Sequence, residues 1–234
     1  MRFGVLSKDK FRVQTSNFKL QTAFGSLKFE VWSLQFALLL TLAGFWLPWL
    51  AARPAALQWN ALELAEWATR LPQVRAGTLA GGKSLVLFPL VGVIWLAGLL
   101  VAMRINSRAA SRAVIGGLAV LNAALLFPGY PFFLQVFDDP ETRAQAALAL
   151  GALAGFAALA AWSGRLPLRM AQAGLLALAL LNLAAAARVL AAFGPALGAL
   201  LPELDRPGVG FWLFMGGNAL IALAAGAALV REGK

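Results

Sequence analysis

The chain has 234 residues, of which 61% are hydrophobic and 13% are charged, and its formal net charge is +10. Soluble domains hold about 45–50% apolar and about 25% charged residues, so this composition predicts a membrane protein. Cysteine and histidine are both absent, which excludes disulfides, thiolate nucleophiles, zinc sites of the Cys/His type and the common haem ligands.

Residues 1–30 are polar and basic, with six Lys/Arg against two acidic residues. A basic segment beside a membrane span gains about 1 kcal/mol per Lys or Arg at an anionic headgroup surface. We therefore expect a cytoplasmic N-terminal arm that lies on anionic lipids of the inner face.

Six long apolar windows follow the arm, and charged residues bracket each of them. About 20 helical residues cross the hydrocarbon layer of ~30 Å, and the windows lack the alternation of barrel strands. The predicted fold class is all-α: a polytopic membrane protein with six transmembrane helices in one bundle (31–230) and a cytoplasmic tail (231–234). The predicted spans are about 31–52, 84–103, 113–134, 144–164, 168–190 and 209–230.

The basic residues predict the orientation of this bundle. With the N-terminus inside, the inner segments carry thirteen Lys/Arg and three acids, whereas the outer segments carry seven of each. Lys and Arg concentrate on the cytoplasmic side of membrane proteins. The pattern predicts both termini inside, in a bacterial-type inner membrane. It also accounts for the net charge without a nucleic-acid partner.

A short amphipathic helix is predicted at residues 60–71, on the outer face. Asn60 and Glu63 have the spacing of a capping box, and Pro72 closes the helix. Its polar face spaces Glu66 and Arg70 at i,i+4. Leu64, Trp67 and Leu71 share the apolar face and are candidate outer-face docking residues. The helix either lies at the bilayer interface or docks on a neighbour, as a gate or a contact.

Two further outer segments accompany it. Pro128, Gly129 and Pro131 predict a break in the third helix near the outer interface. Residues 189–202 form an apolar run that is too short to span and is typical of an interfacial or re-entrant segment. We expect residues 60–71, 128–143 and 189–206 to cap the same end of the bundle.

Four polar residues inside the spans are candidate functional positions: Asn122, Asn182, Arg188 and Asn218. Buried amides commonly form hydrogen bonds between helices; the alternative is that they line a polar solute site. Arg188 reaches the outer headgroups if the fifth helix stops near it. If the helix continues to Phe193, Arg188 lies inside the bundle and needs an anionic acceptor.

A basic stripe is predicted on the inner side, where Arg104, Arg108 and Arg112 recur every four residues. The stripe either anchors to anionic lipid or docks an acidic cytoplasmic partner. Two small-residue faces permit close helix packing: Gly151 with Gly155, and Gly216–Gly217 with Ala222 and Gly226.

The spans contain no carboxylate, which argues against an autonomous ion-coupled transporter and against paired-carboxylate catalysis in the membrane. No phosphate-binding Gly-x-x-x-x-Gly-Lys-Ser/Thr motif occurs. We predict a non-catalytic subunit of a multi-subunit inner-membrane complex, without cofactor or metal, that binds other membrane subunits through its outer-face elements and small-residue faces. The alternative is a solute-binding or permease subunit energised by a separate ATPase, with a polar cavity joining Asn122, Asn182 and Arg188.

Overall fold

The computed structural model describes residues 32–51, 58–79, 82–103, 109–129, 132–200 and 206–232. The predicted N-terminal arm, Arg104 and Arg108 of the basic stripe, the last two residues of the tail and residues 201–205 lie outside these ranges.

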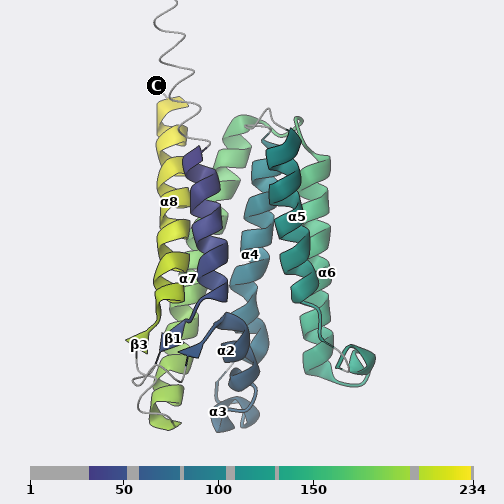
Figure 1. Cartoon of the computed structure of the whole chain (residues 1–234), viewed down its shortest axis with the longest axis vertical. Helices are drawn as coiled ribbons and strands as arrows, with labels where there is room; N and C mark the ends of the chain where they lie inside the picture. Colours follow the sequence, from purple (N-terminus) through teal and green to yellow (C-terminus); the bar gives the residue numbers. More distant parts are fainter. Residues whose placement is uncertain are drawn as a thin grey trace, which may run out of the picture.

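Long helices dominate the described part of the chain (Figure 1). Four are long and apolar enough to cross a membrane: α4 (Gly82–Ala102), α6 (Pro140–Ala161), α7 (Leu168–Leu200) and α8 (Val209–Glu232). Two shorter apolar helices are Trp32–Trp46 and α5 (Ala109–Leu125). This set is compatible with a helical membrane protein, as the composition predicted.

Several helix ends differ from the predicted spans. The first helix ends at Trp46 and not at residue 52, because Pro48 has no N–H for a further helical hydrogen bond. The third ends at Leu125, just before the predicted Pro128–Gly129 break. The fourth begins at Pro140, four residues early, because Asp139 caps it. A proline or a capping residue near the helix end explains each difference.

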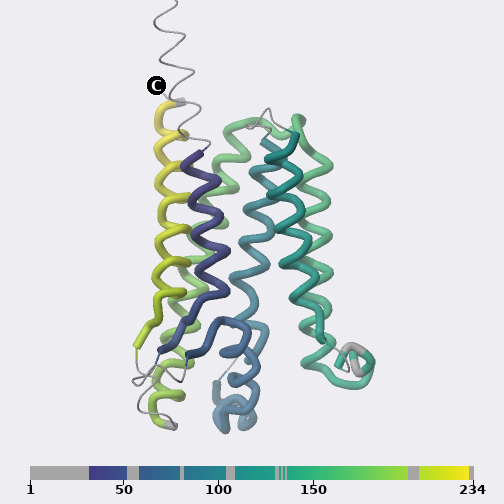
Figure 2. Tube along the Cα trace, in the orientation of Figure 1, coloured from purple at the N-terminus to yellow at the C-terminus, as the bar shows by residue number. Residues whose placement is uncertain are grey.

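The helices alternate in direction, and α4 lies at the centre of the arrangement (Figure 2). It contacts α5, α6 and α7, and 78% of its apolar stretch is buried, against 22% for α6. The start of helix Trp32–Trp46, the end of α4, the start of α5, the α6–α7 connection and the end of α8 gather at one end of the bundle (Figure 1). The other end carries the short elements.

A small three-stranded sheet at that other end was not predicted. Its antiparallel order is β2 (Gln58–Trp59), β1 (Leu50–Ala51), β3 (Arg206–Pro207), with Leu50 opposite both Trp59 and Pro207. The Trp49 N–H donates to the Trp59 carbonyl at 2.7 Å, and the Gly208 N–H donates to the Trp49 carbonyl at 2.7 Å. The sheet thereby joins the end of the first helix to the approaches of α2 and α8.

Two short helices follow β2: α2 (Ala61–Ala68) and α3 (Pro72–Arg75). The amphipathic helix therefore exists but ends before residue 71. Pro72, which was predicted to close the helix, lies beyond the end of α2 and begins α3, where its missing N–H costs no intrahelical bond. A 3₁₀ turn, η1 (Phe132–Gln135), precedes α6.

The segment from residue 189 onward is not a separate re-entrant segment, since α7 runs through it to Leu200 with Pro195 inside the helix. Val189, Phe193 and Leu197 recur every four residues and are at most 1% exposed. At 1.5 Å per residue, 33 residues give a helix of about 50 Å, longer than the ~30 Å hydrocarbon layer. The last turns of α7 therefore extend to the level of the sheet and α2 (Figure 1).

Candidate functional site

The two amides on α7 and α8 bind each other. Asn182 Nδ2 donates to Asn218 Oδ1 at 3.2 Å, and Asn218 Nδ2 donates to the Phe214 carbonyl at 2.9 Å. Both side chains are fully buried. Asn182 also lies against Gly92 of α4, where an added Cβ would come within 2.8 Å of its Cγ. These contacts are the interhelical hydrogen bonding that the sequence suggested for buried amides.

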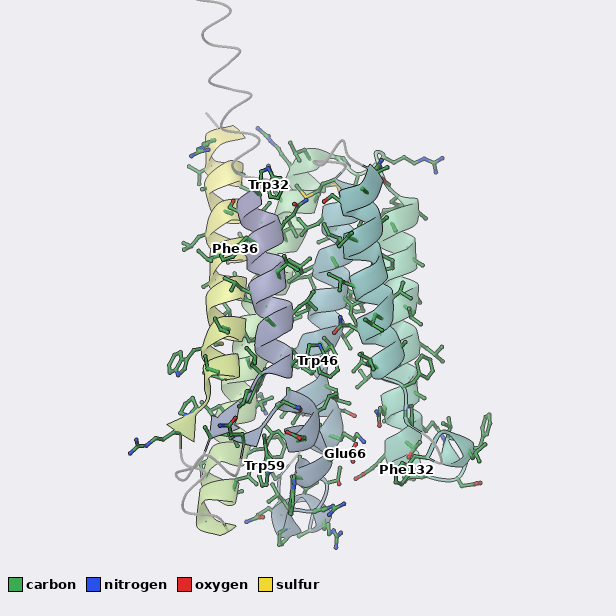
Figure 3. All side chains as sticks on the ribbon, in the orientation of Figure 1. Trp32, Phe36, Trp46, Trp59, Glu66 and Phe132 are labelled. Atoms are coloured by element: carbon green, nitrogen blue, oxygen red, sulfur yellow. The ribbon has the colours of Figure 1, made fainter. Side chains whose placement is uncertain are left out.

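The third amide, Asn122 of α5, binds a residue of the first helix. Trp46 Nε1 donates to Asn122 Oδ1 at 2.8 Å, and Asn122 Nδ2 donates to the Leu118 carbonyl at 2.8 Å. Trp46 lies between its own helix and α5 (Figure 3). The described hydrogen bonds thus place Asn122 in one helix contact and Asn182 with Asn218 in another, and do not join them in one polar site.

Arg188 matches neither of the two arrangements predicted for it. The helix continues past Phe193, yet the Arg188 side chain is exposed on the outside of the bundle. It stands 20 residues, or about 30 Å, from the start of α7, the thickness of a hydrocarbon layer. Since α7 and α8 run antiparallel and pair at Asn182 and Asn218, Arg188 is level with Trp212, which is 61% exposed. A cation and an indole at one level are typical of a membrane interface.

The amphipathic helix α2 has the predicted capping box. Glu63 N–H donates to Asn60 Oδ1 at 3.0 Å, and Asn60 N–H donates to Glu63 Oε2 at 2.8 Å. Glu66 forms an ion pair with Lys83 of α4, whereas the sequence suggested Arg70. The pair ties α2 to the start of the central helix (Figure 3).

Two of the three candidate docking residues are not available for docking. Leu64 and Leu71 are 2% and 1% exposed, because α2 packs against α4 within the chain. Trp67 keeps 41% exposure; it stacks on Trp59 with ring centroids 4.9 Å apart, and the Arg70 guanidinium lies 5.4 Å from its ring centroid. The apolar face thus covers the chain's own core, and only Trp67 offers surface to another molecule.

The start of α6 carries the acids predicted for the next outer segment. Asp139 caps the helix by accepting from the Thr142 hydroxyl and from the Thr142 N–H, the latter at 2.9 Å. These hydrogen bonds, with a smaller contribution from the charge of Lys83, lower the pKa of the Asp139 carboxyl. Arg143 donates to the carbonyls of Val136 and Phe137. These hydrogen bonds join the loop before α6 to the first turn of the helix.

Arg112 is the one described member of the basic stripe. It is partly buried near the start of α5, and its Nε has no hydrogen-bond partner among the described residues. The neighbouring Ser111 hydroxyl accepts from Gln35 Nε2 of the first helix at 3.0 Å. Arg112 lies at the bundle end that holds the start of the first helix and the end of α8 (Figure 1).

The predicted small-residue faces serve packing inside the chain in two places. Gly155 makes room for Trp95 of α4, whose Nε1 donates to the Gly151 carbonyl at 3.3 Å. Gly217 lies against the first helix, where an added Cβ would stand 2.7 Å from the Ala37 carbonyl oxygen. Gly216 and Gly226 meet nothing within 4 Å at the Cβ position.

A third small-residue face, on α6, was missed. Its members recur at alternating steps of three and four residues, and all are exposed: Ala144, Ala147, Gly151, Ala154, Ala158 and Ala161. Leu150 is the one exposed large apolar side chain of α6. The spacing was readable in the sequence, but which face of α6 points outward depends on its contact with α4.

The outward surfaces of the first helix and of α5 carry larger apolar side chains. The first helix exposes Trp32, Phe36 and Leu39, and α5 exposes Val114, Leu121 and Leu125. The small α6 face therefore differs from these two large apolar surfaces. Comparison of the chain with protein-family models, with curated proteins and with solved structures finds no match.

Proposed function

We propose that this chain is a non-catalytic subunit of a multi-subunit complex of the bacterial-type inner membrane. The chain crosses the bilayer six times, with both termini in the cytoplasm. The observation that carries the proposal is the exposed small-residue face of α6. Its 3–4 spacing is the spacing at which two helices pack side by side at a shallow angle.

Inside a membrane, a small-residue face favours association with another helix. Lipid tails are as apolar as leucine, so the hydrophobic effect does not drive helices together inside a bilayer. Small residues promote association there, because they let two backbones approach closely. A helix that is 22% buried and turns an alanine–glycine face outward is suited to receive a transmembrane helix of another subunit.

The hydrogen bonds of the bundle support a scaffold role. Asn182 and Asn218 bind each other, and Asn122 binds Trp46. No described contact favours the alternative permease function, because Arg188 lies outside and the amides hold helices together. The proposed orientation rests on thirteen Lys/Arg in the segments at one end and seven at the other.

Gly151 and Gly117 provide a matched test of the α6 face. Both are exposed glycines of transmembrane helices, on α6 and α5, and at both an added Cβ meets nothing within 4 Å. We expect Gly151→Trp to abolish copurification of partner chains from native membranes in mild detergent. Gly117→Trp should leave it intact, because it alters the bulky surface of α5.

The wild-type chain purified from native membranes should carry stoichiometric partners in mass spectrometry. Purification of the chain alone, with a bound solute, would favour the permease and overturn the proposal. Equal copurification by both tryptophan variants would show that partners bind elsewhere than α6. Labelling of Thr78→Cys, but not Lys234→Cys, by an impermeant maleimide added outside intact cells would confirm the orientation.

A further inference from the structure

The segment between α5 and α6 exposes three large apolar side chains within six residues. Phe132 is 58% exposed, Leu134 is 60% exposed and Phe137 is 84% exposed. We call the segment Phe132–Phe137 the apolar loop. No value among the exposed large apolar residues of the described chain is higher than that of Phe137. Exposure of large apolar side chains to water is unfavourable. Whether these three side chains meet water or lipid depends on the position of the loop relative to the bilayer.

The loop is structured without help from these three side chains. Arg143 binds the carbonyls of Val136 and Phe137, and Asp139 caps the helix that follows. The backbone is thereby fixed by polar contacts from α6. The three apolar side chains, which contribute little to the core, remain available to the surroundings.

The register of the bundle gives the level of the loop. Helices α4 and α6 run in the same direction (Figure 1). An added Cβ on Gly155 would meet Trp95, and one on Gly98 would stand 3.2 Å from the Leu159 side chain. These contacts offset the numbering of α6 and α4 by about 60 residues, so Pro140 lies at the level of the N-terminal end of α4, within one helical turn of Gly82. Lys83 stands there, close enough for its charge to act on Asp139, and it pairs with Glu66.

The apolar loop thus lies where the apolar stretches of α4 and α6 begin and the charged groups end. It also projects sideways from the bundle, away from α2, α3 and the sheet (Figures 1 and 2). Phe132 is on this projection, apart from Trp59 and Glu66 (Figure 3). A sideways projection at this level meets the boundary between headgroups and acyl chains.

We propose that the apolar loop is a lipid-binding element that inserts Phe132, Leu134 and Phe137 into the outer leaflet of the surrounding phospholipid bilayer. Apolar and aromatic side chains gain free energy at the headgroup–acyl boundary. The acids that follow, Asp138 and Glu141, are exposed and remain in water. The loop then fixes the height of the α5–α6 hairpin in the membrane, independently of any protein partner.

The absence of native cysteine allows a direct test. Phe137→Cys and Leu134→Cys are each labelled with an environment-sensitive fluorophore in the full chain. Thr78→Cys, an exposed residue after α3, is the control. The labelled proteins are reconstituted into vesicles of phosphatidylethanolamine and phosphatidylglycerol, with or without lipids that carry a quencher near the headgroup.

We expect blue-shifted emission and strong lipid-borne quenching at positions 134 and 137, with several-fold weaker quenching by aqueous iodide than at Thr78. Iodide quenching equal to that at Thr78 in these vesicles would overturn the proposal. Protection in native membranes combined with exposure in the vesicles would also overturn it, because a protein would then cover the loop. Two labelled positions guard against one substitution that disturbs the turn.

Discussion

The first helix, Trp32–Trp46, meets two neighbours in physically different ways. Against α8 the contact is between backbones: an added Cβ on Gly44 would stand 2.8 Å from the Gly210 carbonyl oxygen, and one on Gly210 would stand 2.7 Å from the Gly44 carbonyl oxygen. Against α5 the structure places two side-chain hydrogen bonds, Gln35 to Ser111 and Trp46 to Asn122.

The first helix is therefore held by close backbone packing on its α8 side and by two separate side-chain hydrogen bonds on its α5 side. Both hydrogen bonds join residues 76 apart in sequence, so the first helix and α5 run parallel with one register. The bonds lie 11 residues apart, or about 16 Å along the helix. A methyl group added at Gly44 or Gly210 would disrupt the α8 contact, whereas each hydrogen bond of the α5 contact can be lost separately.

The largest expected effect is at the backbone contact. Gly44→Ala should lower the free energy of unfolding by about 3 kcal/mol, because the new methyl group overlaps backbone atoms of α8 that cannot move aside. The measurement is equilibrium unfolding in mixed micelles. Gly216→Ala is the control on α8; it meets nothing within 4 Å and should stay within about 1 kcal/mol of wild type. Equal effects of the two substitutions would contradict the close contact.

An intermediate effect is expected where α4 meets the amide pair. Gly92→Ala should cost about 2 kcal/mol, because its methyl group meets the Asn182 amide. Asn182→Ala should cost about 1–2 kcal/mol, because Asn218 loses its partner. In the double variant the clash disappears, so the combined loss should be smaller than the sum by about 1 kcal/mol. Strict additivity would show that Gly92 and Asn182 do not touch.

The smallest effect is expected at the side-chain contact with α5. Trp46→Phe should cost about 0.6 kcal/mol, the average of hydrogen bonds between membrane helices. Ser111→Ala should cost a similar amount, and the two losses should add, because the bonds are about 16 Å apart. A double variant that loses far more than the sum would indicate that the contact opens as one unit. The same unfolding measurement decides between these outcomes.

Local chemistry made much of the fold readable in the sequence. The charge-bracketed apolar windows located the long helices, and the Asn60–Glu63 spacing predicted the capping box that the structure contains. Pro128 and Gly129 predicted where the α5 helix would break. These features depend on residues close in sequence, so neighbouring side chains and backbone groups are sufficient to specify them.

The tertiary structure alone decided which partners these elements meet. It showed that α7 continues through Pro195, because Val189, Phe193 and Leu197 are buried on one face. It also formed the two-residue strands, which are too short to leave a periodic pattern in the sequence. Each asparagine was identifiable as a polar residue in an apolar span, but its partner was not.

The outward faces of the helices show the same difference between what the sequence determines and what the tertiary structure decides. The sequence by itself determined that α6 has a stripe of alanine and glycine and that α2 has an apolar face. The three-dimensional packing buried the face of α2 against α4 and left the stripe of α6 exposed. Periodicity fixes which residues share a face of a helix, whereas contacts between distant segments decide whether that face meets the chain, the lipid or another subunit.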